Sequence, residues 1–282
     1  MAAAVEPVAA QESPEQVVAA MLARARSALA AYESHSQERI DEAVTALAWA
    51  IYKPENAQAL AELAVRDTGL GTVASKVVKN QRKTFGTLRD LSRVRSVGII
   101  EDDPARGLVK YAKPVGVVAA VCPSTNPVAT PVNKAMMALK GGNAVIIAPS
   151  PSGHATTART VELMRAELDK SGNPIDLVQV LPAPVTKELT QALVSGADLA
   201  VVTGSQDNVR RSMQSGTVTI GVGAGNVPVI VDVSADLDDA AEKIAASKIF
   251  DNATSCSSEN ALIVLDGVYE PMLAALERQG GH

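Results

Sequence analysis

The sequence predicts an α/β fold: N-terminal helices followed by a doubly wound parallel sheet. From Val115 onward, short apolar runs alternate with helical periodicity, as in parallel strands joined by helical crossovers. The run 115–121 is apolar throughout, which is typical of a strand buried on both faces of such a sheet. Before residue 95 the apolar residues recur only at helical spacing.

The N-terminal part is expected to be helical after an Ala-rich start. Residues 1–14 are expected to be disordered. Ser13 can then cap a helix, Pro14 suits its first position, and Gln16 completes a capping box. Further helix boundaries are expected at Ser36, Pro54 and Gly69.

A basic stretch follows in the fourth expected helix. Its seven cationic side chains are Lys76, Lys79, Arg82, Lys83, Arg89, Arg93 and Arg95. We interpret them as a solvated helix face. The charges of both signs are otherwise dispersed and the net charge is −5, so a nucleic-acid partner is not expected.

The remaining elements follow in order. A β-hairpin is expected from 97–100 and 108–111, joined by a turn-rich loop. Later strands are expected at 115–121, 144–147, 178–181, 199–202, 229–231 and 261–265. Helices are expected at 132–139, 157–168, 187–194, 209–213, 238–249 and 268–276.

Three loops follow strands of the predicted sheet, where such sheets bind ligands. They span 122–127, 149–152 and 203–205 and are small, polar and rich in Ser, Thr or Pro. This composition suits the close approach of a nucleotide, although ordinary turns use the same residues. The candidate cofactor residues are Ser124, Thr125, Ser150, Thr203, Gly204, Ser205, Val222 and Gly223.

The last two of these belong to the glycine-rich segment 221–226. It lacks the third glycine of a dinucleotide fingerprint, because position 226 is Asn. It is also expected to precede a strand, whereas the fingerprint follows one. We therefore reject a Rossmann fingerprint and interpret these glycines as a tight backbone passage or a turn.

The two cysteines differ in their surroundings. Their small number indicates a reducing compartment rather than a disulfide scaffold. Cys122 ends a buried strand and is expected to be an inert core residue. Cys256 lies among small hydroxyl residues between a helix and a strand, where backbone N–H groups could stabilise a thiolate. It is either a nucleophile or a structural cysteine in a Ser-rich loop.

Metal and membrane sites are not expected. The three histidines are scattered, and none has a second ligand at zinc-like spacing. The N-terminus lacks the pattern of a signal peptide, and no apolar run is long enough to cross a bilayer. The protein is expected to be cytoplasmic.

Several motifs in order resemble the aldehyde dehydrogenase superfamily, specifically its CoA-acylating branch. They are Asn126 in Pro-Ser-Thr-Asn-Pro, the run 139–146, the loop 203–205, the segment 221–228, and Phe250-Asp251-Asn252 leading to Cys256. The resemblance implies that Cys256 attacks an aldehyde and then carries the acyl group as a thioester. It implies that the Asn126 amide, with the backbone N–H of Cys256, stabilises the oxyanion. It also implies residues 15–222 as N-terminal helices with an NAD(P)-binding domain, and 223–282 as the start of the catalytic domain.

The departures from the family pattern refine this expectation. Hydrolytic members carry a Glu that activates water, and Val222 takes its position, which leaves CoA as the acyl acceptor. The stretch 148–151 has neither the Lys nor the Glu that often hold the adenosine ribose, so NADP is slightly favoured over NAD, with Ser150 as a possible contact. The family continues beyond residue 282, so the chain looks truncated and is expected to have little activity alone.

The resemblance favours sulfoacetaldehyde as the substrate, converted to sulfoacetyl-CoA. Acetaldehyde- or propionaldehyde-type acylating enzymes and a non-acylating dehydrogenase are the alternatives. An inactive fragment that binds a nucleotide or a partner chain is an alternative of another class. The expected partners are a small aldehyde and CoA, and the complete protein is expected to be a homo-oligomer, a dimer or a tetramer.

Overall fold

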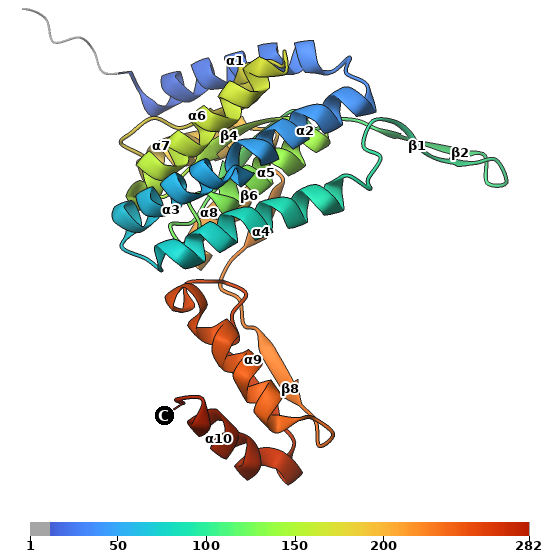
Figure 1. The fold of residues 1–282 in the computed structure, drawn as a ribbon. Helices are drawn as coiled ribbons and strands as arrows, with labels where there is room; N and C mark the ends of the chain where they lie inside the picture. Colours follow the sequence, from blue (N-terminus) through green and yellow to red (C-terminus); the bar gives the residue numbers. More distant parts are fainter. Residues whose placement is uncertain (1–11, 282) are drawn as a thin grey trace, which may run out of the picture.

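Four helices precede the first strand in the computed structural model, which describes residues 12–281 (Figure 1). They are α1 (Pro14–Tyr32), α2 (Gln37–Tyr52), α3 (Pro54–Thr68) and α4 (Val73–Leu91). The capping box at Ser13 and Gln16 is confirmed, and so is the left-handed glycine Gly69 at the end of α3. Most of the segment expected to be disordered lies outside the described residues, but Pro14 already belongs to α1.

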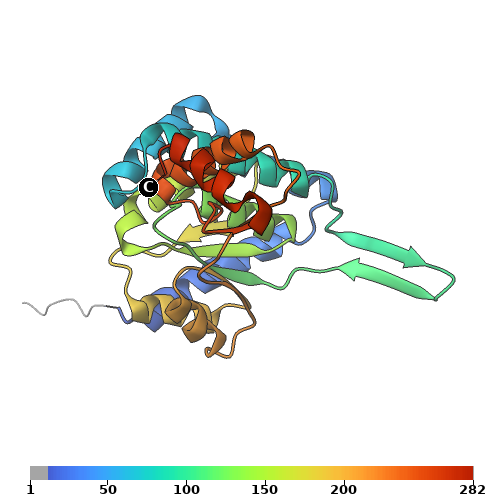
Figure 2. The same ribbon diagram turned by 90° about the horizontal axis from the view of Figure 1, so that it is seen from below.

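The expected β-hairpin is confirmed. Strands β1 (Gly98–Asp103) and β2 (Leu108–Ala112) pair antiparallel, with an irregular register near Ile99. Figure 2 shows the hairpin reaching well away from the remainder of the chain. Both strands are largely exposed, and their exposed side chains include Ile100, Val109 and Tyr111.

A five-stranded parallel sheet forms the centre of the fold, in the order β5-β4-β3-β6-β7. The strands are β3 (Val117–Val121), β4 (Ala144–Ala148), β5 (Val178–Val180), β6 (Leu199–Thr203) and β7 (Thr219–Val222). Every residue of β3 and β4 is buried, as their unbroken apolar sequences predict. The predicted α/β class with a doubly wound sheet is therefore confirmed.

Helices cover both faces of this sheet. Helices α5 and α6 pack on one face, backed by α2, α3 and α4, while α1, α7 and α8 cover the other (Figure 1). The crossover helices are α5 (Ala129–Lys140), α6 (His154–Lys170), α7 (Lys187–Gly196) and α8 (Gln206–Met213). The chain moves from β3 outward to β5 and then returns to place β6 against the other edge of β3. Strands β3 and β6 therefore flank the switch point of the sheet.

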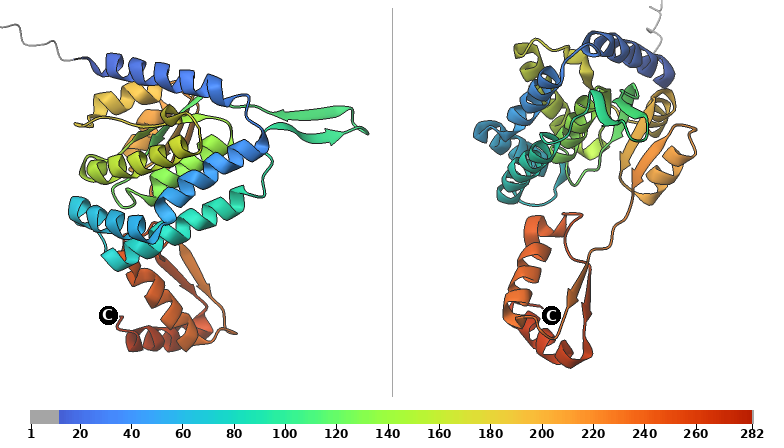
Figure 3. Two further views of the ribbon diagram at one scale, coloured as in Figure 1. Left: turned by 45° about the horizontal axis from the view of Figure 1, so that its top comes forward. Right: turned by 90° about the vertical axis from the view of Figure 1, so that its right-hand side faces the viewer.

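A smaller α/β unit follows. Strands β8 (Pro228–Val231) and β9 (Ala261–Val264) pair in parallel, with α9 (Leu237–Ile249) between them and α10 (Tyr269–Arg278) after them. Figure 3 shows both helices on one side of the strand pair. Their small core is formed by Val231, Ala241, Met272 and Ala275.

One strand was not expected. Residues 219–222 form β7 at the edge of the large sheet, so the glycine-rich segment 221–226 begins inside a strand that was not predicted, and it precedes β8 as predicted. A half-exposed edge strand of Thr, Ile, Gly and Val gives a weak signal, because glycine is unfavourable in strands. The rejection of the Rossmann fingerprint still stands on its missing third glycine.

Among residues 12–281, no helix combines the length and the apolar character that a membrane crossing needs.

Candidate active site

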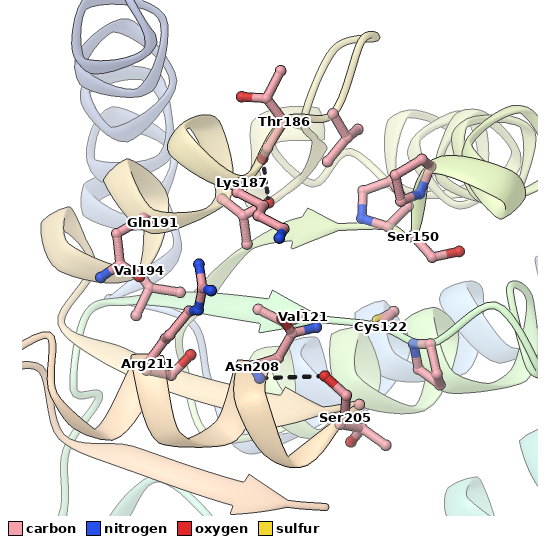
Figure 4. Close-up of a pocket in the computed structure, with 18 of the residues that line it drawn as sticks. Val121, Cys122, Ser150, Thr186, Lys187, Gln191, Val194, Ser205, Asn208 and Arg211 are labelled. Atoms are coloured by element: carbon pink, nitrogen blue, oxygen red, sulfur yellow. Dashed lines mark hydrogen bonds between the residues drawn. The ribbon is translucent and has the colours of Figure 1, made fainter.

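A cavity of about 1260 Å³ opens at the carboxyl ends of the sheet strands (Figure 4). Its walls come from the loops after β3, β4 and β6, from α1, α7 and α8, and from the loop that carries Cys256. The cavity therefore lies at the switch point, where parallel α/β sheets bind ligands.

Nine of the ten candidate residues line this cavity. They are Ser124, Thr125, Asn126, Ser150, Thr203, Gly204, Ser205, Gly223 and Cys256. Val222 is the exception, since it is the last residue of β7, its side chain is exposed, and it is absent from the cavity lining. Residues from five separate chain segments thus meet in one cavity, although their individual roles stay predictions.

Lys134 fixes the floor beneath these loops. Its Nζ donates to the carbonyl oxygens of Val121 at 2.6 Å and Val201 at 2.9 Å, which joins β3 to β6 at the switch point. Burial lowers the pKa of this ammonium group. Sequence reasoning missed Lys134, which reads as one more residue of an amphipathic helix.

Asn126 lies at the turn between β3 and α5 and is buried. Its backbone carbonyl accepts a hydrogen bond from Thr130 at 3.4 Å. Within the described part of the chain, no hydrogen bond occupies its side-chain amide. An amide held in place by its backbone but left without a protein partner suits donation to a ligand oxygen.

The cysteine loop has an unusual backbone. Asp251, Asn252 and Ala253 have φ angles of 54°, 53° and 58°, three successive non-glycine residues in the left-handed region. Each costs about 1–2 kcal/mol, so the surroundings must hold the loop in this shape. Thr254 contributes by donating from its backbone N–H and its hydroxyl to the Asp251 carbonyl. Cys256 follows this turn and is exposed.

The carboxylate of Asp251 is buried against two lysines of α4. Lys76 Nζ lies 2.9 Å from Asp251 Oδ2, and Lys79 Nζ also donates to this oxygen. Both lysines are about 2% exposed, so the interpretation of the basic stretch as a solvated face is wrong for these two residues. Tertiary contact decided this outcome, because Asp251 is remote in sequence and helical periodicity cannot identify a distant partner.

The ionisation of this cluster follows from burial and hydrogen bonding. Burial by itself raises the pKa of Asp251, but hydrogen bonds from Lys79, Lys76 and Thr254 outweigh it and hold that pKa below its usual value. Burial lowers the pKa of Lys79. The hydrogen bond to Asp251 raises this pKa and the charge of the neighbouring Lys76 lowers it, and the net shift is downward. The two lysines compete as cations for one carboxylate.

Cys122 has the properties expected of a core thiol. It is 3% exposed, and burial raises its pKa to about 11. A thiol of this kind is rarely a thiolate at neutral pH. Cys122 is buried, whereas Cys256 is exposed.

Two cations in the cavity wall were not predicted. Lys187 begins α7 and Arg211 lies on α8, and Figure 4 shows their side chains extending into the same part of the cavity. Arg211 Nε also lies 2.9 Å from Asp207. Arg211 is thus an exposed helix residue that also lines the cavity, while Arg210 is exposed and absent from the lining.

Within the part of the chain that the structure describes, no group of three or more His, Cys, Asp or Glu residues lies close enough to hold a metal ion.

Comparison with known proteins gives consistent matches. The model of the "Aldehyde dehydrogenase family" matches residues 5–279. An acylating sulfoacetaldehyde dehydrogenase of Cupriavidus necator is 56% identical over 275 residues, which are 98% of this chain and 56% of that protein. The chain thus spans little more than half the length of this relative.

Solved structures match over the same portion. An acetylating aldehyde dehydrogenase from Geobacillus thermoglucosidasius superposes with a TM-score of 0.88 at 35% identity, covering 94% of this chain and 59% of that one. A Rhodopseudomonas palustris propionaldehyde dehydrogenase with bound CoA and an acylated cysteine gives 0.81 at 27% identity, covering 93% and 59%. The family match, the relative and these structures agree with the resemblance found in the sequence, and the chain belongs to the aldehyde dehydrogenase family.

Proposed function

We propose that the protein oxidises an aldehyde to an acyl-CoA with NAD(P), through a thioester on Cys256. One observation carries this proposal: Cys256 and Asn126 line the same cavity as the loops at the carboxyl ends of the sheet. A nucleophile, an amide donor and a nucleotide-sized cavity at a switch point are together the parts that such a reaction needs.

The chain's own residues perform the first step in this proposal. The Cys256 sulfur forms a bond to the aldehyde carbon, and the carbonyl oxygen becomes an oxyanion. The side-chain amide of Asn126 and the backbone N–H of Cys256 donate to that oxyanion, a contribution on the order of 3 kcal/mol per donor. NAD(P), when bound, would supply the hydride acceptor that oxidises this adduct to a thioester on Cys256.

The residue at position 222 and the lining of the cavity support transfer to CoA rather than to water. Hydrolysis of the thioester needs a base that can activate water near the sulfur. Valine at position 222 cannot act as such a base. The carboxylates among the described lining residues are Glu15 and Glu188, which belong to helices α1 and α7 and not to the loop that carries Cys256. The thiol of CoA then attacks the thioester, takes the acyl group and restores the cysteine. The Rhodopseudomonas palustris structure, with bound CoA and an acylated cysteine, supports this order for a related protein.

We propose NADP as the preferred cofactor. The loop after β4 carries no carboxylate that would repel a 2′-phosphate, since it reads Ala-Pro-Ser-Pro over 148–151. Lys187 and Arg211 add two positive charges to the same cavity, and Ser150 adds a hydroxyl. The carboxylates of Glu188 and of Asp207, which pairs with Arg211, offset part of this positive charge. The N–H groups of the two cations can still donate hydrogen bonds to a phosphate.

The proposed substrate is sulfoacetaldehyde, because the relative that shares 56% identity is a sulfoacetaldehyde dehydrogenase. Acetaldehyde and propionaldehyde are the alternatives, in line with the two structural relatives. The sulfonate requires a cationic group at the mouth of the site, so substrate choice is a direct experimental question.

We further propose that the complete protein is a homo-oligomer, and that the hairpin β1–β2 contacts a second copy. The hairpin extends away from the remainder of the chain and exposes Leu108, Val109 and Tyr111, at 43%, 47% and 61%. Apolar side chains on a projecting two-stranded ribbon need a partner surface, since an isolated hairpin is barely stable in water. Light scattering of the protein with and without the Val109→Asp and Tyr111→Asp changes tests this point, and an unchanged mass would contradict it.

The main test is a coupled assay of the purified complete protein. It offers sulfoacetaldehyde, acetaldehyde, propionaldehyde and succinate semialdehyde with NAD or NADP, with and without CoA. The proposal expects CoA-dependent acyl-CoA formation that Cys256→Ser abolishes and Cys122→Ser retains. Equal formation of free acid without CoA would exclude the acylating assignment, and an undiminished Cys256→Ser enzyme would exclude the nucleophile.

A further inference from the structure

Lys76 contacts two loops that the proposed chemistry needs to align. Its Nζ donates to the carbonyl oxygen of Thr125 at 2.8 Å, the residue directly before Asn126. The same Nζ lies 2.9 Å from Asp251 Oδ2 in the turn that leads to Cys256. The two loops belong to different α/β units and have no covalent connection nearby, so this ammonium group joins them directly.

Asp251 transmits this contact to the cysteine loop. Its Oδ1 accepts from the Thr72 backbone N–H at 3.1 Å, and its Oδ2 accepts from the Thr254 hydroxyl at 2.7 Å. The residue is 1% exposed and begins the left-handed run that precedes Cys256. Because a buried carboxylate with this many donors has no alternative position without losing them, the turn is held to α4.

We propose that Lys76 is a positioning residue that sets the separation between the Asn126 amide and the Cys256 sulfur. The inference rests on the proposed roles of these two residues. An oxyanion donor acts only within about 2.7–3.1 Å of the oxygen that it stabilises, and a misplacement of about 1 Å can cost about 100-fold in rate. A single buried cation that bonds both loops fixes this separation better than two independent contacts would.

Lys79 provides a matched control. It lies one turn farther along α4, is equally buried, and donates to the same Asp251 oxygen. Within the described residues it makes no hydrogen bond to the loop that carries Asn126. Loss of either lysine therefore removes one buried cation from Asp251, but only loss of Lys76 releases the Asn126 loop.

Two probes separate the alignment of the loops from the availability of the thiol. With p-nitrophenyl acetate, the Cys256 sulfur forms a bond to the ester carbon, the carbon–oxygen bond breaks, and p-nitrophenolate leaves. This reaction passes through an oxyanion and needs neither CoA nor a nicotinamide cofactor. Iodoacetamide reacts with the same sulfur by displacement of iodide from a saturated carbon, and no oxyanion forms.

The expected results are specific to Lys76. Asn126→Ala should slow acylation by about 100- to 1000-fold, and Lys76→Met should slow it at least about 10-fold, with alkylation of Cys256 in both within about 2-fold of the unchanged chain. Lys79→Met should retain acylation within about 3-fold. The double variant Lys76→Met/Asn126→Ala should be no slower than Asn126→Ala alone, because both changes remove the same contribution.

Other outcomes would overturn the inference. Equal acylation losses in Lys76→Met and Lys79→Met would show that Lys76 contributes only as an ion-pair partner of Asp251. Additive losses in the double variant would show that Lys76 does not act through Asn126. If Lys76→Met does not fold, Lys76→Gln replaces it with the same expectation, since its shorter amide cannot reach both acceptors. Absence of any Cys256-dependent acylation in the unchanged chain would overturn the proposed nucleophile and this inference together, whereas normal acylation in Lys76→Met beside a slowed Asn126→Ala would overturn the inference alone.

Discussion

Gly71 is the position where one added methyl group should disturb the buried cluster most directly. Its φ is +72°, and a Cβ built there would lie 1.9 Å from Asp251 Oδ1. Gly69, two residues earlier, has a φ of +66° and open space around its Cβ position. The two glycines therefore share the left-handed backbone and differ in their contact with the carboxylate, so Gly69→Ala is the matched control for Gly71→Ala.

The magnitudes follow from this geometry. An alanine in the left-handed region costs about 1 kcal/mol, which both variants incur. Gly71→Ala must in addition move the Asp251 carboxylate away from Lys76, Lys79 and Thr72, and breaking a buried ion pair costs about 3–5 kcal/mol. Partial relaxation of the loop should keep this second loss near about 3 kcal/mol, so we expect Gly71→Ala to lose about 4 kcal/mol in total.

Urea denaturation of the chain and both variants measures these losses. The variants are compared by the urea concentration at which half of the protein is unfolded. If the free energy of unfolding depends on urea with the same slope in each variant, a change in this midpoint reports a change in the free energy of unfolding. Equal losses in Gly69→Ala and Gly71→Ala would refute the reasoning, because the contact with Asp251 would then contribute nothing.

Three further predictions concern the core, the cluster and the cofactor. Ile147→Ala should lower the free energy of unfolding by about 3 kcal/mol because Ile147 is 0% exposed, whereas Ile220→Ala, at 56% exposed, should cost less than about 1 kcal/mol in the same urea titration. The pKa of Lys79 is lowered in the folded chain, so between that pKa and about 10.4 the unfolded chain binds more protons than the folded chain does. The free energy of unfolding of the unchanged chain should therefore rise with pH relative to that of Lys79→Met. A fall in this difference in free energy from about pH 8 to about pH 10 would contradict the sign. Lys187→Ala and Arg211→Ala should each weaken NADP binding by about 10-fold or more in calorimetry and leave NAD binding nearly unchanged. The control variant Arg210→Ala should bind NADP nearly as the unchanged chain does. Parallel losses for both cofactors would argue against a 2′-phosphate contact.

Many elements of the fold could be predicted because their signals are local. A capping box at Ser13 and a left-handed glycine at Gly69 mark helix ends through contacts within a few residues. The unbroken apolar sequence of β4 predicts burial on both faces in the same way. Strand β7 escaped prediction because Gly221 weakens its pattern, and only pairing with β6 makes it a strand.

The loop residues of the candidate site were largely predictable, whereas its helical cations and its geometry were not. Ser124, Ser150 and Ser205 were selected because each follows a strand, and parallel topology brings such loops to one edge. Arg211 and Lys187 gave no such signal, because a cation on an amphipathic helix looks the same in sequence whether it faces solvent or a cavity.

The sequence by itself determined the fold class, the family resemblance and the identity of Cys256 and Asn126 as candidates, since these depend on periodicity and on motifs within short stretches. Only the tertiary structure decided that Lys76 and Lys79 are buried and that Lys76 joins the two loops of the proposed site. The physical reason is that the environment of a charge depends on partners far away in the chain. A lysine that reads as a solvated helix residue becomes buried when a remote carboxylate offers its charge a partner.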